Sequence, residues 1–275
     1  MPAAGEPEER GETQMKIYLV RHGETTLNAR ECYYGRTDVC LSGRGRRQAE
    51  ELRNFFGQIP LDAVVTSPLK RAVETAEIIL SGRGIAGASE QTEPAGRGIA
   101  GVSEQTELAG RESAGVANPA GEDSGRGTMA EGAGRDSTTE AIKIYRDERL
   151  CEQDFGIFEG LTYRELTKRY PEQLDAWNRD YFGYRIPEGE SFLDVRRRVE
   201  LFFGDLKERA ATAGRESALL LVAHKGTLGH FLAVSLGLPP EGYWNFVFEQ
   251  GCYSRIDLED GYAIIRKLNQ SAREQ

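Results

Sequence analysis

Two of the three histidines in this 275-residue chain follow short apolar segments in the same way. The run KIYLV (16–20) leads into an Arg-His-Gly string that contains His22, and the run ALLLVA (218–223) leads into His224. Parallel sheets bind ligands beyond the carboxyl ends of their strands, so both imidazoles are expected at one edge of a shared sheet. A third apolar segment is followed by a helical pattern that carries Arg71 in its first turns, at the same edge.

Imidazole and guanidinium groups at one edge of a sheet are suited to binding a phosphate ester and reacting with it. Arg21 and Arg71 offer planar sets of N–H donors that match phosphate oxygens, and a phosphate monoester carries about −1.5 to −2 charges near neutral pH. A neutral imidazole is a competent nucleophile toward phosphorus, and nearby cations stabilise the charge on the transferred group. The pattern therefore predicts phosphoryl transfer through a histidine.

Such a reaction also needs a proton donor, because an alkoxide is a poor leaving group and general acid catalysis contributes about 10²- to 10⁴-fold. The segment CEQDFGIFEG (151–160) follows a predicted strand and supplies three carboxylates, Glu152, Asp154 and Glu159. Glu152 is the first candidate. The residue types alone do not choose among the three.

Apolar segments alternate with helical patterns along most of the chain. Strands are expected at 16–20, 61–67, 142–150 and 218–223, with a closing hairpin at 252–268. Helices are expected at 42–56, 67–80, 163–180, 190–210 and 226–238. Ser42 and Ser67 are expected to cap the first two helices, with Pro68 at the first helical position of the second. This alternation predicts an α/β sandwich with a mostly parallel sheet.

The segment 81–141 has a different composition. The sequence GRGIAGASEQTEPA (82–95) is followed at once by the near copy GRGIAGVSEQTELA (96–109), and the segment contains no aromatic residue. Burial could not offset the conformational entropy lost on ordering such a chain. We therefore expect a disordered low-complexity insertion within a domain spanning 15–275, preceded by a disordered leader at 1–14. The alternative for the insertion is an arm that binds another protein.

Composition argues against several classes of partner. The formal net charge of −9 and the pI near 5.1 disfavour a general nucleic-acid binder, because phosphate backbones attract basic surfaces. No apolar run is long enough to span a membrane, and the N-terminus lacks the apolar core of a signal peptide, so a cytoplasmic protein is predicted. The cysteines form no metal-binding or disulfide pattern. Free thiols are expected at Cys32, Cys40, Cys151 and Cys252.

In these residues the chain resembles the histidine phosphatase superfamily, whose members share the phosphoglycerate mutase-like fold. The superfamily signature Arg-His-Gly-Glu-Thr stands here at 21–25. Six strings occur in the family's order: LVRHGETTLN, GRTDVCLSGRGRRQAE, TSPLKRAVETA, LCEQDFGIFEG, PEGESF and LLLVAHKGTLGHFL. The resemblance covers nearly everything except the leader and the insertion, and it implies a three-layer α/β sandwich.

The resemblance also implies a role for each residue of the predicted site. His22 would become phosphorylated, and Glu152 would be the proton donor, which chooses among the three carboxylates. Arg21, Arg71 and His224 would line the phosphate pocket. Substrate contacts would come from Gly23, Thr25, Asn28, Tyr34 and Lys225. The implied substrate is a small-molecule phosphate monoester, and no metal or cofactor is needed.

Within the superfamily, the string CYYGRTDV (32–39) together with EQDFGIFEG and PEGESF looks most like the alpha-ribazole phosphatases of cobalamin assembly. Those enzymes remove the 5′-phosphate from alpha-ribazole phosphate. The alternatives are a broad-specificity histidine phosphatase, a phosphoglycerate mutase-like enzyme and, more remotely, an inactive phosphate-binding regulatory module. Two departures bear on the substrate, since Lys225 stands where the family usually has Gly and Gly229 where many members have Arg.

Other polar residues are expected to be structural. His230 has no motif partner, and Asp154 and Glu159 are the two carboxylates left without a catalytic role. Tyr33 and Tyr34 are open between loop packing and contact with substrate. Two groups of arginines are expected on solvated helix faces: Arg44, Arg46 and Arg47, and Arg196 to Arg198.

Overall fold

The structure is a computed structural model that describes residues 14–83, 85–86, 142–212 and 216–272. The chain divides into one unit made of 1–92 with 140–275 and a second unit at 93–139, and all described residues belong to the first. The predicted leader, except Gln14, and nearly all of the predicted insertion lie outside the described residues. Two boundaries differ from the prediction, since Gln14 is the first residue of a strand and Ile85–Ala86, within the segment expected to be disordered, forms a short strand. Within the described ranges, no helix combines the length and apolar character needed to cross a membrane.

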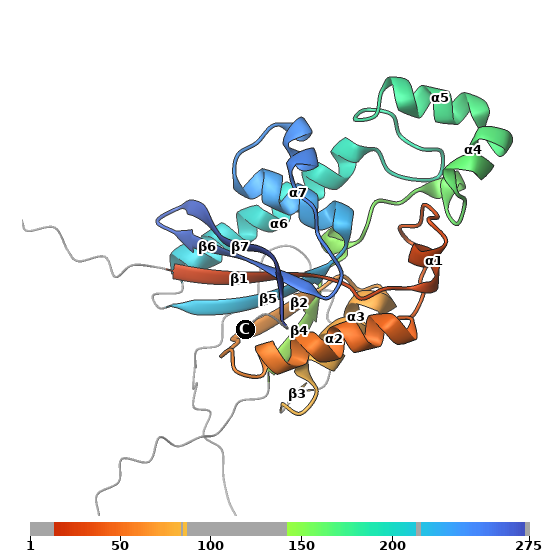
Figure 1. Ribbon diagram of the computed structural model, residues 1–275. Coiled ribbons are helices and arrows are strands. Elements are labelled where there is room, and N and C mark those ends of the chain that lie inside the picture. The colour runs from red at the N-terminus through yellow and green to blue at the C-terminus, as the bar shows by residue number, and fades with distance from the viewer. Residues whose placement is uncertain (1–13, 84, 87–141, 213–215, 273–275) are drawn as a thin grey trace, which may run out of the picture. The chain divides into compact units, whose positions relative to one another are not determined.

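The described strands form one sheet in the order β3-β4-β2-β5-β1-β6-β7 (Figure 1). Neighbours from β3 to β1 are parallel, whereas β6 and β7 are antiparallel to their neighbours. The central strand β5 is buried along almost its whole length, which explains its continuous apolar run. The bounds are β1 (Gln14–Arg21), β2 (Ala63–Thr66), β3 (Ile85–Ala86), β4 (Ile142–Arg146), β5 (Ser217–Ala223), β6 (Cys252–Glu259) and β7 (Tyr262–Ser271).

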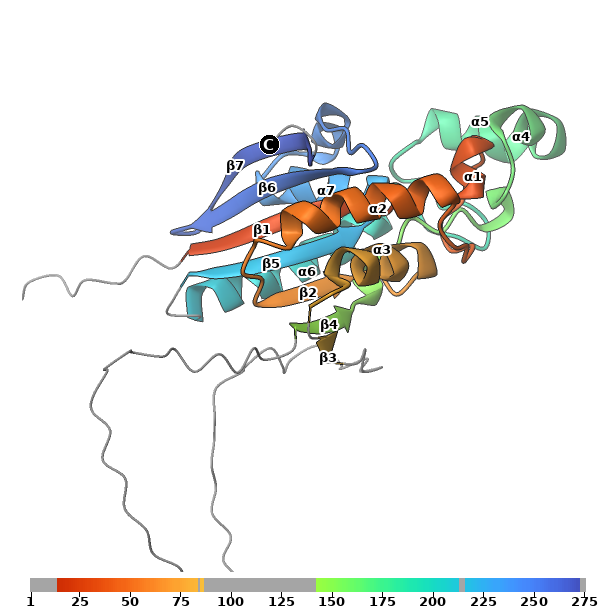
Figure 2. The same ribbon diagram turned by 60° about the horizontal axis from the view of Figure 1, so that its bottom comes forward.

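Helices cover both faces of this sheet. Helices α2 and α3 lie on one face and α6 and α7 on the other, whereas α1, α4 and α5 lie beyond the carboxyl end of β1 (Figures 1 and 2). The bounds are α1 (Thr26–Ala29), α2 (Gly43–Phe56), α3 (Lys70–Leu80), α4 (Tyr163–Arg169), α5 (Pro171–Arg179), α6 (Phe192–Thr212) and α7 (Lys225–Ser235), with 3-10 turns η1 (Glu148–Leu150), η2 (Gly156–Phe158) and η3 (Pro240–Asn245). The predicted three-layer α/β sandwich is confirmed.

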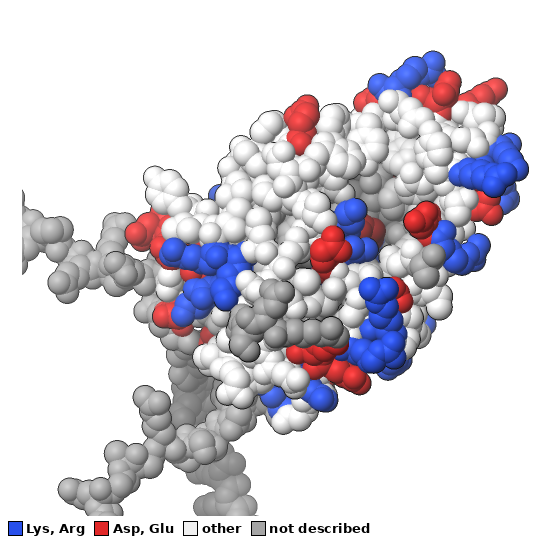
Figure 3. Space-filling view, in the orientation of Figure 1, with Lys and Arg blue, Asp and Glu red and all other residues white. Residues whose placement is uncertain are grey.

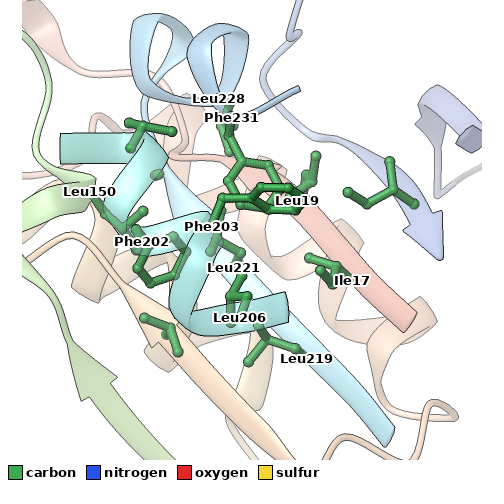
Figure 4. Packing of buried hydrophobic residues seen from close by; sticks show 14 of the residues in the cluster. Ile17, Leu19, Leu150, Phe202, Phe203, Leu206, Leu219, Leu221, Leu228 and Phe231 are labelled. Carbon is green, nitrogen blue, oxygen red and sulfur yellow. The ribbon is translucent and has the colours of Figure 1, made fainter. Parts of the chain in front are cut away.

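Successive residues of the central strands fill two separate cores. Leu19 and Leu221 belong to the core on the α6–α7 side, and Val20 and Val222 to the core on the α2–α3 side. Figure 4 shows Phe203 of α6 among the strand leucines of the first core. Truncating such a buried leucine to alanine typically costs about 2–5 kcal/mol. The two cores therefore hold β1 and β5 in a single register, and that register positions the residues that follow each strand.

The start of α3 differs from the prediction. The helix begins at Lys70 with Leu69 as its N-cap residue, and no side chain caps it. The predictions that Ser67 caps this helix and that Pro68 is its first residue are wrong. The helix begins two residues after Pro68, and the hydroxyl of Ser67 lies 2.8 Å from Nε2 of His224 instead. The cap predicted for α2 is confirmed, since Ser42 Oγ accepts a hydrogen bond from the amide of Gly45 at 3.1 Å.

Two other boundaries were also misplaced by the sequence pattern. The helical segment predicted at 163–180 is two helices, and Tyr170 between them has the non-helical angles φ −136° and ψ 54°. Pro171 explains the break, because proline disfavours a helical conformation at the preceding residue and suits the first position of a helix. The strand predicted at 142–150 ends at Arg146 and is followed by η1.

Candidate active site

The register between β1 and β5 brings the two predicted histidines together. Arg21 is paired with Ala223 across these parallel strands, so His22 and His224 are the next residues on neighbouring chains. The centroids of their rings are 5.0 Å apart, and both side chains are buried. The carboxyl edge of the sheet therefore carries two enclosed imidazoles side by side.

The ring of His22 presents one nitrogen for chemistry. Its Nδ1 lies 2.7 Å from the carbonyl oxygen of Gly23, and a carbonyl only accepts hydrogen bonds, so Nδ1 carries the hydrogen and Nε2 the lone pair. Burial and the charges of Arg71 and Arg21 lower the pKa of His22 well below 6.5. The imidazole is therefore neutral at pH 7, and its Nε2 is a potential nucleophile.

His224 is held at both ring nitrogens. Arg71 Nε donates to Nδ1 at 3.2 Å, so Nδ1 accepts and Nε2 carries the hydrogen, which it donates to Ser67 Oγ at 2.8 Å. Burial and the charge of Arg71 lower the pKa of His224 well below 6.5. Ser67 is a site residue that the sequence analysis missed. The available signal was its position directly after β2, at the same edge of the sheet as both histidines.

Arg71 is a fully buried cation held by neutral groups. Its Nη1 and Nη2 donate to the carbonyl oxygens of Thr37 and Gly35 at 2.9 and 2.7 Å, and its Cζ lies 4.8 Å from the ring centroid of Tyr34. None of the ion pairs found among the described residues involves Arg71. Burial lowers the pKa of Arg71, but a guanidinium stays charged in proteins. A buried charge of this kind favours an anionic ligand.

Arg21 supplies a second cation with an unused donor. Its Nη1 donates to the carbonyl oxygen of Phe248 at 3.0 Å, whereas its buried Nε finds no hydrogen-bond partner within the described part of the chain. Burial lowers the pKa of Arg21, and the carboxylate of Glu152 opposes this. Because unsatisfied buried donors are rare, this N–H group would gain from an anion bound beside it.

One carboxylate orders the loop that binds Arg71. Glu159 accepts hydrogen bonds from the amides of Gly35, Arg36 and Thr37 at 2.7, 3.0 and 3.1 Å, and also from the hydroxyl of Thr37. Gly35 and Thr37 are the residues whose carbonyl groups bind the guanidinium. Glu159 therefore positions Arg71 through the loop, in keeping with the structural role expected for it.

Glu152 lies at the start of α7, the helix that begins directly after His224. Its Oε2 accepts a hydrogen bond from the amide of Gly226 at 3.0 Å, and its Oε1 accepts one from the amide of Gln153 at 3.0 Å. A Cβ atom at position 226 would collide with Oε1 of Glu152. Glycine at this position therefore lets the carboxylate lie directly against the helix, at the same edge as the two imidazoles.

The segment that carries Glu152 is anchored by an arginine from α6. Arg198 donates to the carbonyl oxygens of Arg149 and Glu152 at 2.6 and 3.1 Å, and it pairs with Glu190 at 3.1 Å. Its side chain is 13% exposed, against 76% for its neighbour Arg197. The prediction of a solvated face is wrong for Arg198, because its side chain reaches the backbone of a loop distant in the sequence. It is also wrong for Arg196, whose side chain is 14% exposed and donates to the carbonyl oxygen of Leu238 at 2.8 Å.

Comparison with known proteins identifies the family. The model of the histidine phosphatase superfamily (branch 1) matches residues 17–93 and 129–271. The chain belongs to the histidine phosphatase superfamily. This membership confirms the family and the phosphatase activity expected from the sequence, together with the phosphoglycerate mutase-like fold.

Several similar proteins cover almost the whole of this histidine phosphatase. The adenosylcobalamin/alpha-ribazole phosphatase of Escherichia coli is 28% identical over 94% of this chain and 97% of that protein. Its counterpart in Salmonella typhimurium is 29% identical over 94% and 98%. The crystal structure of a putative alpha-ribazole-5′-P phosphatase from Escherichia coli has a TM-score of 0.69 at 26% identity, covering 93% of this chain and 96% of that chain.

Most of the other residues that were expected to contact substrate lie in the segment after β1. Their hydrogen bonds hold this segment in place. Thr25 and Asn28 form a capping box at the start of α1. The hydroxyl of Thr25 lies 2.7 Å from the hydroxyl of Tyr34, and the amide of Gly23 donates to Thr75 Oγ1 at 3.0 Å. The structure therefore brings these residues together around the loop that carries His22.

Lys225 and His230 lie on α7 outside this group of contacts. Lys225 is exposed at the first position of the helix. His230 is buried with its ring centroid 4.2 Å from that of Phe192 and 4.9 Å from that of Tyr243. Burial lowers the pKa of His230 to about 3. Its ring therefore packs as a neutral group among aromatic side chains, in line with the structural role expected for it.

Proposed function

We propose that this histidine phosphatase removes the phosphate from alpha-ribazole 5′-phosphate through a phosphohistidine on His22. The substrate is supported by near full-length similarity to proteins whose names specify alpha-ribazole. The observation that carries the mechanism is the neutral ring of His22, whose Nδ1 is bound to a carbonyl while two cations, the half-buried Arg21 and the buried Arg71, lower its pKa further.

In the first step, the lone pair on Nε2 of His22 forms a bond to phosphorus, and the bond from phosphorus to the ester oxygen breaks. Arg21 and Arg71 bind the phosphoryl oxygens and stabilise the charge that spreads over them, with His224 lining the same pocket. The protonated carboxyl group of Glu152 donates its proton to the leaving oxygen, so the alcohol leaves as a neutral molecule.

In the second step, a water molecule attacks phosphorus and the bond between phosphorus and Nε2 of His22 breaks. Glu152, now ionised, accepts a proton from this water and returns to its protonated form. Inorganic phosphate leaves, and the imidazole is again neutral. The proposed cycle needs no metal or cofactor, and activity in EDTA tests this part of it.

Five further residues are assigned to substrate positioning around this centre: Gly23, Thr25, Asn28, Tyr34 and Lys225. A cytoplasmic location is also part of the proposal. It is supported by cysteines that form no disulfide within the described residues, as expected in a reducing compartment.

A broad-specificity phosphomonoesterase is the second candidate. The chain is also similar to phosphoserine phosphatase 1 of Hydrogenobacter thermophilus, at 23% identity over 93% of this chain and 92% of that protein. The chain is thus similar over nearly its full length to phosphatases whose names specify very different phosphate esters. This favours a site that binds the phosphate group tightly and the leaving alcohol more loosely.

A substrate panel on the full chain in EDTA tests the proposal. We expect the highest kcat/KM for alpha-ribazole 5′-phosphate, compared with phosphoserine and 3-phosphoglycerate. Comparable values for all three esters would support the broad-specificity candidate, and mutase activity with a bisphosphate primer would contradict both candidates. Lack of turnover of any ester, including a chromogenic one, would indicate a phosphate-binding module without catalytic activity.

A further inference from the structure

Helix α7 carries two glycines on one face, and each is covered by a side chain from elsewhere. A Cβ atom at Gly226 would collide with the carboxylate of Glu152, and one at Gly229 would lie 2.7 Å from Cε2 of Tyr243. Residues three apart on a helix are neighbours with Cβ positions about 5–6 Å apart. The ring of Tyr243 therefore packs on α7 beside the Glu152 carboxylate, one turn further along the helix.

A group of aromatic rings continues from Tyr243 to the surface. Its ring centroid is 4.9 Å from that of Trp244, whose centroid is 5.2 Å from that of Tyr181. We call Tyr181, Tyr243 and Trp244 the aromatic wall. Trp244 is 57% exposed although it belongs to this packed group. Large exposed aromatic side chains are often binding surfaces when they adjoin a functional site.

The effect of the Glu152 charge on two tyrosine pKa values is consistent with a short distance between Glu152 and the aromatic wall. Burial raises the pKa of Tyr181 to about 12, and the carboxylate of Glu152 adds to this rise. Burial raises the pKa of Tyr243 as well, again with a contribution from Glu152. Figure 3 shows a hollow between the α6–α7 part and the α4–α5 part that is lined mainly by uncharged residues, with charged atoms at its lower end.

The orientation of the substrate in the proposed reaction determines which of its parts contacts the aromatic wall. The phosphoryl group is bound by the arginines and attacked by His22, and the proton from Glu152 goes to the oxygen of the leaving alcohol. The organic part of that alcohol must therefore extend past Glu152, away from the imidazoles. Along α7, the next surface in that direction is the ring of Tyr243 over Gly229.

We propose that the aromatic wall is a binding site for a flat, uncharged aromatic ring on the alcohol part of the substrate. The inference rests on the proposed function, because the direction of the leaving group comes from the role of Glu152. Rings of this kind stack on tryptophan and tyrosine faces without needing a counter-charge. Gly229 contributes by leaving room for the Tyr243 ring, which an arginine side chain at this position would displace.

The test compares two phosphate esters of ribose, one with the aromatic ring at C1 and one with a hydroxyl group in its place. For the full chain and for Trp244→Ala, kcat and KM are measured with alpha-ribazole 5′-phosphate and with ribose 5-phosphate. We expect the KM of the ring-bearing ester to rise about tenfold in the variant, with kcat and the constants for ribose 5-phosphate close to wild type. Trp244→Phe, which keeps a ring, is expected to restore most of the affinity.

Two further variants control for general effects. Tyr262→Ala removes another exposed aromatic ring, at the start of β7, and is expected to change neither KM. Gly229→Ala leaves all three rings present but forces the Tyr243 ring to shift, so it is expected to raise the KM of the ring-bearing ester only. Far-ultraviolet circular dichroism checks that each variant is folded.

Three results would overturn the inference. These are an equal change for both esters in Trp244→Ala, no change for either ester, or a wild-type protein that shows no preference for the ring. If the wild type rejects alpha-ribazole 5′-phosphate but prefers other nucleoside 5′-phosphates to ribose 5-phosphate, the substrate proposal fails separately. Loss of that preference in Trp244→Ala would then still support the wall.

Discussion

The two sides of the site are built in different ways. On the phosphate side, His22, His224 and Arg71 are buried and each is bound to a neighbouring polar group. On the leaving-group side, rings pack on one another and against α7, and Trp244 is left open to solvent. The phosphoryl group is the same in every monoester whereas the alcohol differs, so a rigid site suits the first and an adaptable surface suits the second.

The two sides should also respond differently to substitution. Removing one member of a buried polar set leaves its partner unsatisfied, which costs about 1–3 kcal/mol. Removing an exposed ring usually changes stability by no more than about 0.5 kcal/mol. Substitutions on the phosphate side are therefore expected to reduce the rate for all esters, and those in the aromatic wall to change the preference among esters.

The largest effect is expected for His22→Ala on the phosphate side. Turnover of every ester should fall about 10⁴-fold or more, because the covalent route is lost. Rapid-quench trapping should yield no acid-labile phosphoenzyme. The third histidine provides the control, since His230→Gln should still form the phosphoenzyme. Equal turnover by His22→Ala and the wild type would exclude this residue as the nucleophile.

Glu152→Gln acts where the two sides meet. The rate of enzyme phosphorylation by an alkyl ester should fall about 10²- to 10⁴-fold, because the leaving alkoxide is no longer protonated. With p-nitrophenyl phosphate the same rate should change little, since nitrophenolate leaves without a proton. Single-turnover rapid-quench measurements check both rates. An equal loss with the two esters would show that Glu152 is not the proton donor.

Glu159→Ala tests whether the phosphate side depends on the loop that holds Arg71. We expect kcat/KM to fall about 10²-fold for all esters, since a displacement of about 1 Å in a positioning group has this effect. Inhibition by inorganic phosphate should weaken in parallel.

The matched control for this prediction is Asp154→Asn. Its carboxylate lies in the same segment but accepts a hydrogen bond from the amide of Gly156 at 2.9 Å, and among the described residues it has no hydrogen bond to residues 35–37. This variant should keep near wild-type kcat/KM, and Glu159→Gln should retain part of the activity. A loss of the same size in Asp154→Asn would mean that the effect is general disturbance of the segment.

Arg198→Ala tests whether Arg198 anchors the segment that carries Glu152. We expect the free energy of unfolding to fall by about 2 kcal/mol, because the variant loses the ion pair with Glu190 and the donor that binds two carbonyl groups. Arg197→Ala, the neighbour on the same helix, should change it by no more than about 0.5 kcal/mol. Urea unfolding measures both values, and equal losses would contradict the anchoring role of Arg198.

The smallest effect expected is a shift in pH dependence. The pKa of His22 is lowered by burial and two arginines, so the acid limb of kcat/KM should lie below pH 6.5. The folded pKa values of His22 and His224 lie below the unfolded value. The unfolded chain therefore binds more protons as pH falls below 6.5, and stability decreases.

The aromatic wall should not contribute to this pH dependence. The pKa of Tyr181 is raised to about 12, and tryptophan has no titratable group, so Trp244→Ala should leave the acid limb unchanged. Profiles of kcat/KM between pH 4 and 8 test both statements. An acid limb above pH 6.5 in the wild type would contradict a buried, neutral His22.

Local sequence patterns predicted most of the strands and helices correctly, in those places where the packing of the sheet requires the same conformation. The apolar runs before His22 and His224 are buried strands, and Ser42 caps the helix that it precedes. Ser67 shows where such signals fail. A serine followed by proline is an ordinary pattern for a helix start, but its hydroxyl accepts a hydrogen bond from His224 across the sheet, a residue 157 positions away.

The reactive groups at the strand ends could be derived without coordinates, because a buried run is apolar and its last residue is visible in the chain. The groups that surround them could not. Glu159 binds the loop that holds Arg71, Arg198 binds the backbone of Glu152, and Tyr243 packs on α7. No local periodicity in the sequence predicts these contacts. Such contacts depend on strand register and on the space left by Gly226 and Gly229, which exist only once the sheet and α7 have packed together.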